Sequence, residues 1–101
     1  MIENSINFRI YFWMINKYGL KGNDLLLFAY LHYFTVCMAE HGCVQTRKEM
    51  AEHLHISVYM IHKVMENLMF NNLVESFHYW DNGTPHQAYR TTVIEKGYEK
   101  A

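Results

Sequence analysis

Cationic and amide side chains recur in residues 47–67 at a spacing that favours the outer face of a pair of helices. Lys and Arg bind phosphate oxygens, and an amide side chain can pair with the edge of an adenine. If Ile61, Val64 and Leu68 face the core, helical spacing exposes the polar side chains of the same helix. The candidate contacts to phosphates or bases are Arg47, Lys48, Ser57, Tyr59, His62, Lys63 and Asn67.

Two short helices must position these side chains. Thr46 with Glu49 three residues later forms a capping box, which predicts the start of the first helix of the pair. Ser57 is expected to cap the second helix after a turn of about three residues. Asn71 and Asn72 are expected to end that helix.

The elements before this pair are expected to be a strand and a long helix. Residues 7–15 alternate, with Phe8, Ile10, Phe12 and Met14 on one face and Arg9, Tyr11 and Trp13 on the other. A helix is possible here, but the β-branched and aromatic content favours a strand or an extended arm. Residues 24–41 are apolar nearly all round and predict a packed helix. Asn23 is its expected N-cap, and Gly42 its expected C-cap.

A hairpin is expected to follow the helices. LVESFHYW and HQAYRTTVI flank the turn DNGTP, in which Asn82-Gly83 is a strong hairpin signal. Asn82, His86 and Arg90 are candidate nucleic-acid contacts from this hairpin. Residues 1–6 and 95–101 are expected to fray.

The expected fold class is mainly α with a small β part (α+β), in one domain over residues 1–101, with a three-helix core, an N-terminal strand and a C-terminal hairpin. Over residues 8–94 the chain resembles a bacterial or phage winged helix-turn-helix domain, with the hairpin as the wing. WMINKYGLKGNDLLLFAYLHYFT, residues 13–35, is similar to the segment that opens the N-terminal domains of mobile-element replication proteins and of small transcriptional regulators.

The resemblance implies binding to double-stranded DNA, with the helix at residues 57–71 in the major groove. It implies a role in transcription regulation or in DNA replication of a mobile element. Small proteins of this class usually read two half-sites as homodimers, so a homodimer is expected. Five aromatic residues are the candidate interface: Tyr11, Trp13, Phe77, Tyr79 and Trp80.

The charge balance departs from that class. From residue 44 to 101 there are six Lys or Arg and seven Asp or Glu, a net of −1, and Arg90 is the only Lys or Arg between Lys63 and Lys96. A protein-interaction module on the same frame is therefore the alternative function. His53, His55, His62, His78 and His86 could add cationic charge in mild acid, or be surface residues without a role.

Other chemistries are not indicated. Cys37, His41 and Cys43 match no common zinc spacing, so no metal and no cofactor are expected. Enzyme motifs and paired carboxylates are absent from the sequence, and no small-molecule substrate is evident. The start of the chain shows no secretory signal, and residues 25–39 are too short to span a bilayer. A cytoplasmic location without membrane partners is expected.

Overall fold

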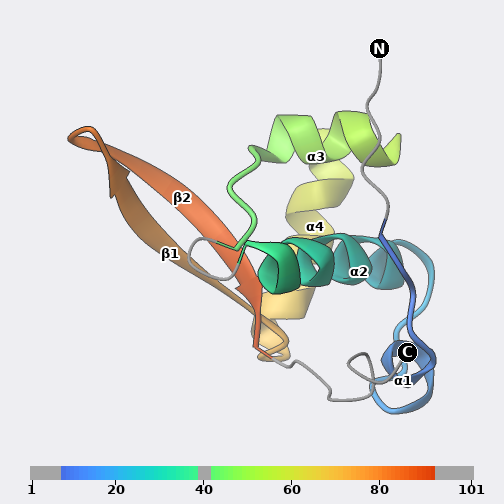
Figure 1. Cartoon of the computed structure of the whole chain (residues 1–101). Helices are drawn as coiled ribbons and strands as arrows, with labels where there is room; N and C mark the ends of the chain where they lie inside the picture. Colours follow the sequence, from blue (N-terminus) through green and yellow to red (C-terminus); the bar gives the residue numbers. More distant parts are fainter. Residues whose placement is uncertain (1–7, 39–41, 93–101) are drawn as a thin grey trace.

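The computed structural model describes residues 8–38 and 42–92 of the 101-residue chain. Four helices precede one antiparallel hairpin, which confirms the α+β class with a C-terminal hairpin. The elements are α1 (Phe12–Asn16), α2 (Gly22–Cys37), α3 (Arg47–Leu54), α4 (Val58–Phe70), β1 (Val74–Asp81) and β2 (Thr84–Thr91). Figure 1 shows the hairpin extending away from the helices.

Helix α2 lies at the centre and packs against α1, α4 and β2. Its middle is buried almost all round, at Leu27, Phe28, Ala29, Tyr30, Leu31 and His32. The phenol of Tyr30 forms a hydrogen bond of 2.7 Å with Nδ1 of His53 on α3, and burial raises the pKa of that phenol. No helix in the described part of the chain is long and apolar enough to cross a membrane.

Helices α3 and α4 begin where their caps predict. The hydroxyl of Thr46 accepts from the Glu49 amide at 3.1 Å, and the Glu49 carboxylate accepts from the Thr46 amide at 2.9 Å, so the capping box is confirmed. The hydroxyl of Ser57 accepts from the Met60 amide at 3.0 Å. Three residues separate the helices, and the first of them, His55, takes a left-handed φ of 59° that turns the chain sharply.

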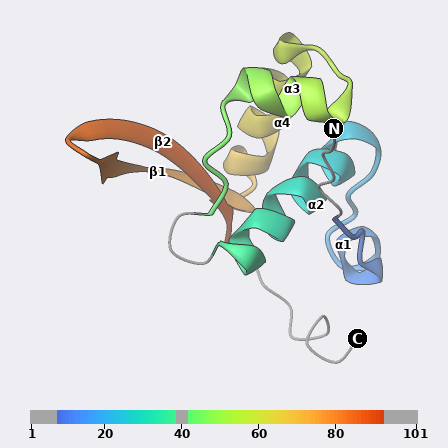
Figure 2. The same cartoon turned by 45° about the horizontal axis from the view of Figure 1, so that its top comes forward.

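The hairpin has the predicted turn and is anchored at its base. Asn82 and Gly83 both have positive φ, as the tight hairpin turn requires. At the other end, the amide of Thr91 donates to the hydroxyl of Thr35 on α2 at 3.0 Å. Tyr89 and Cys43 exchange two backbone hydrogen bonds, of 2.7 and 2.9 Å. Both views show that the tip lies away from the helices, so only the base is fixed to the core (Figures 1 and 2).

The prediction of an N-terminal strand is wrong, and the helical core has four members instead of three. Residues 8–11 are irregular and residues 12–16 are helical. Alternation would put Phe12 and Met14 on one face, whereas Phe12 is 75% exposed and Met14 is fully buried. Backbone groups in this segment find partners locally, for example from the Lys17 amide to the Trp13 carbonyl at 2.9 Å.

The boundaries of the long helix also differ from the prediction. Helix α2 begins at Gly22 with Lys21 in the N-cap position, so Asn23 is inside the helix and caps nothing. The helix ends at Cys37 instead of residue 41, and residues 39–41 lie outside the described ranges. Gly42 has the expected left-handed φ of 66°, and its amide donates to the carbonyl of Met38, the C-cap residue of α2, at 2.7 Å. The next residue, Cys43, pairs with Tyr89 of β2. The frayed ends that the sequence predicts fall on residues outside the described ranges.

His32 makes stability depend on pH. Its ring lies among the rings of Trp13, Tyr11 and Phe28, at centroid distances of 5.3, 5.7 and 6.3 Å. Burial lowers the pKa of His32 below its ordinary value of 6.5. The unfolded chain then binds this proton more tightly than the folded chain. The contribution of neutral His32 to the free energy of unfolding therefore has its full value above pH 6.5. It decreases as the pH drops below 6.5.

We expect a lower Tm at about pH 5 than at about pH 7.5, measured by circular dichroism in one buffer series. A His32→Gln variant should show a weaker fall than the unaltered chain. The matched control is His78→Gln on β1, where the side chain is exposed and the fall should persist. An equal fall in all three proteins would contradict the assignment to His32.

Candidate nucleic-acid interface

Helix α4 divides cleanly into a buried face and an open one. Ile61, Val64 and Leu68 are buried with Met65, which confirms the predicted inward positions. The opposite side is exposed at Tyr59, His62, Lys63, Glu66, Asn67 and Phe70. We call Tyr59, His62, Lys63, Glu66 and Phe70 the outer face of α4. A helix with one face fixed in a core presents the other rigidly to a partner.

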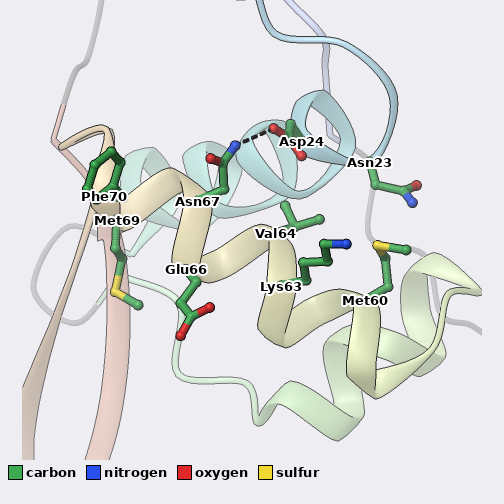
Figure 3. A pocket seen from close by; sticks show the side chains of 9 residues that line it. All are labelled: Asn23, Asp24, Met60, Lys63, Val64, Glu66, Asn67, Met69 and Phe70. Atoms are coloured by element: carbon green, nitrogen blue, oxygen red, sulfur yellow. Dashed lines mark hydrogen bonds between the residues drawn. The ribbon is translucent and has the colours of Figure 1, made fainter.

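The outer face is electrically mixed. Lys63 and Glu66 carry opposite charges one turn apart, and neither has a hydrogen bond or ion pair with any described residue. Their side chains extend in different directions, with Lys63 on the Met60 side and Glu66 away from Asp24 (Figure 3). They line an open groove of about 910 Å³ with Met60 and Phe70. The face therefore offers one cation, one anion, two polar rings and apolar surface, without a continuous positive stripe.

Arg47 is held at the edge of this face by two other elements. Its Nε donates to the phenol oxygen of Tyr89 on β2 at 2.9 Å, and its Nη1 lies 2.6 Å from Nδ1 of His62 on α4. The guanidinium carbon is 5.4 Å from the centre of the Tyr89 ring. A guanidinium has five N–H donors, so three remain for a further partner. Because its orientation is already fixed, a phosphate would bind it at a smaller loss of side-chain entropy.

Other predicted contacts lie near the start of the two helices. Lys48 is exposed in the first turn of α3, and Tyr59 is 69% exposed in the first turn of α4. The oxygen of Ser57 is used as the N-cap, while its O–H can still donate. The N-terminus of a helix carries partial positive charge, which favours a phosphate beside Ser57.

Asn67 is placed differently from the others. Its Nδ2 donates to Oδ2 of Asp24 at 2.7 Å, which ties α4 to the start of α2 (Figure 3). Asn71 in turn donates to the backbone carbonyl of Asn67 at 2.9 Å. Reading an adenine with this amide would require the Asp24 bond to break. Asn67 therefore fits a structural link better than a base contact, although its predicted role stays a prediction.

The three predicted hairpin contacts do not join the α4 face. Asn82 is in the turn at the tip, and His86 stacks on Tyr79 with ring centroids 5.4 Å apart. The guanidinium of Arg90 lies 4.3 Å from the centre of the Phe77 ring, and its Nε is 3.6 Å from a carboxylate oxygen of Glu75. The charge of Arg90 is thus balanced within the hairpin.

The predicted interface aromatics separate into two groups. Trp13 is half-buried and packs edge-on against Phe28 at 6.1 Å, while its ring stacks with Tyr11 at the same distance. In the hairpin, Phe77 and Tyr79 are half-buried, whereas Trp80 is 70% exposed. Trp80 is therefore the member of the set with most surface open to a partner.

The cysteines named as possible metal ligands lie in different environments. Cys37 is exposed, Cys43 is buried, and burial raises the pKa of the Cys43 thiol to about 12. His41 lies outside the described residues. Within residues 8–38 and 42–92, no group of three His, Cys, Asp or Glu is placed to hold a metal ion.

Three residues of this site are not among the contacts predicted from the sequence: Glu66, Phe70 and Tyr89. Tyr89 fixes Arg47 across 42 positions of the chain, a separation at which local patterns carry no information. Phe70 is 84% exposed at the end of α4. Its position four residues after Glu66 on the same outer stripe was the available signal for it.

Comparisons of the chain with protein-family models, with curated proteins and with solved structures gave no match.

Proposed function

We propose that this chain is a winged helix-turn-helix module that binds double-stranded DNA with the outer face of α4 in the major groove. The hairpin corresponds to the wing. The observation that carries the proposal is the rigid, open face of α4, flanked at its edge by the fixed guanidinium of Arg47. The major groove admits an α-helix presented in this way.

The arrangement around α4 supports the proposal. Helix α3 precedes α4 by three residues and is linked to it by the Arg47–His62 contact. Lys48 at the start of α3 could bind the same backbone as Arg47. Such contacts would set the register of the protein on the duplex, while Lys63 would reach into the groove.

We place the module in the cytoplasm, in transcription control or in the replication of a mobile element. We expect it to act as a homodimer on two half-sites. The exposed Trp80 is the residue we propose for the dimer contact.

The charge balance predicts the strength of salt dependence. Arg47 and Lys48 are expected to bind phosphates and Lys63 to lie in the groove, so about three cations should displace counterions from the duplex. The slope of log association constant against log salt should then be about −2.7. Affinity should then fall about 40-fold between about 50 and 200 mM salt. Fluorescence anisotropy of a labelled random-sequence duplex measures this slope directly.

A substitution on α4 tests whether this helix binds the duplex. Lys63→Ala should weaken binding and reduce the magnitude of the slope by about one. The matched control is Arg9→Ala, because Arg9 is an exposed cation that lines a separate hollow with Tyr33 and Val36. A chain that binds no duplex at the lower salt concentration, or binds equally at both, would contradict the proposal.

A protein-interaction module is the second candidate function. It is favoured by large exposed apolar side chains, with Phe70 84% and Phe12 75% exposed. It predicts self-association that persists in Lys63→Ala and is lost in Trp80→Ser, measured by analytical ultracentrifugation. Self-association without any affinity for duplex would favour this function over DNA binding.

A further inference from the structure

We propose that Glu66 is a specificity-determining residue that selects a cytosine in the major groove. The inference rests on the proposed DNA-binding function and assigns part of its sequence preference. Glu66 is exposed on the outer face of α4, one turn after Lys63, and its carboxylate has no partner among the described residues. It would enter the groove with that face.

A carboxylate in this position restricts what the face can bind. It is repelled by phosphates and can only accept hydrogen bonds when ionised. The base edges of the major groove offer it two donors, the N4 amino group of cytosine and the N6 amino group of adenine. Adenine N6 lies between two acceptors, its own N7 and O4 of the paired thymine. Cytosine N4 has an acceptor on one side only, so it is the better partner for Glu66.

Lys63 would contact a base pair close to the one that Glu66 contacts. A lysine ammonium donates to O6 and N7 of guanine. Three residues along a helix rise about 4.5 Å, and successive base pairs about 3.4 Å, so Lys63 and Glu66 would contact neighbouring or next-neighbouring pairs. The two side chains extend apart instead of pairing with each other, which leaves both available (Figure 3). The preferred duplex therefore contains a C close to a G.

The mixed charge of α4 makes base contacts more important. Because only about three cations near α4 would approach the duplex, the affinity that does not depend on sequence is modest. Discrimination between bases then accounts for more of the total binding. A cytosine contact of this kind should be worth about 5- to 150-fold over the wrong base.

The test is selection of duplexes from a random pool, with the unaltered chain and with Glu66→Gln. Glutamine both donates and accepts, and pairs with N6 and N7 of adenine. At one position of the selected site, the preference should change from C in the unaltered chain to A in the variant. Competition anisotropy with duplexes that differ only at that position should show the reversal.

The control variant is Glu52→Gln on α3, which removes the same charge from another exposed carboxylate. Each variant loses one negative charge, so both should bind duplexes that lack the preferred C somewhat more tightly than the unaltered chain does. Only Glu66→Gln should change the preferred base. Thermal unfolding checks that both variants fold, and both positions are exposed.

The outcomes separate the inference from the function beneath it. Selection of one motif by all three proteins would overturn the role of Glu66 and leave DNA binding standing. Failure of the unaltered chain to select or bind any duplex would overturn the DNA-binding function and the inference together.

Discussion

The Gly42→Ala variant is expected to lose about 2–5 kcal/mol of its free energy of unfolding, from left-handed strain of about 1–2 kcal/mol and overpacking of about 1–3 kcal/mol. Gly42 has φ +66°, and a Cβ there would lie 2.5 Å from the backbone oxygen of Tyr89 and 3.2 Å from Cβ of Arg90. The neighbouring Cys43–Tyr89 backbone pairing anchors β2. The substitution therefore strains the attachment of the hairpin to the helices.

Urea unfolding followed by circular dichroism measures this loss. Gly19→Ala is a close control, because Gly19 also has φ +66° but no heavy atom within 4 Å of an added Cβ. It should lose only the conformational part, about 1–2 kcal/mol. Equal losses in the two variants would mean that the contact with β2 contributes nothing at Gly42.

The Arg47→Ala variant is expected to bind duplex about 10- to 150-fold more weakly, the equivalent of one charge-assisted contact of about 1.5–3 kcal/mol. Arg47 is bonded to Tyr89 and His62 and has N–H groups left for a phosphate. The loss combines a phosphate contact with the fixed orientation that makes it strong. Anisotropy at constant salt measures the change.

Arg47→Lys separates charge from geometry. A lysine keeps the positive charge but has no planar fork to bond two protein groups and a phosphate together. It should therefore recover little of the lost affinity. Full recovery would show that Arg47 contributes only its charge. Circular dichroism of both variants must show folded protein at the assay temperature, because the same bonds join α3, α4 and β2.

Local signals in the sequence predicted the frame of the molecule. The capping box of Thr46 and Glu49, the Ser57 cap and the Asn82-Gly83 turn all involve groups within three residues of each other. Interactions at that range depend little on the rest of the chain. The starts of α3 and α4 and the turn of the hairpin could be predicted for this reason. The second strand was expected over residues 86–94, whereas β2 is Thr84–Thr91.

The sequence-based predictions were wrong or incomplete where the structure of a segment depends on residues far away in the chain. Alternating residues near Phe12 predicted a strand, but Phe12–Asn16 form a short helix whose backbone bonds are local and whose Met14 is buried in the core. Asn67 has a side chain that could read a base, yet its amide donates a hydrogen bond to Asp24, 43 positions away. Arg47 is similar, with a partner 42 positions away. Which polar groups remain open to a ligand depends on such distant contacts.

Nuclear magnetic resonance can test most directly whether the outer face of α4 binds DNA. The measurement is a titration of the ¹⁵N-labelled chain with a short random-sequence duplex at low salt, followed through backbone amide shifts. We predict that the largest changes occur at Tyr59, Lys63 and Glu66 on α4 and at Arg47 on α3. An absence of changes, or changes confined to the hairpin tip around Trp80, would contradict DNA binding by this face.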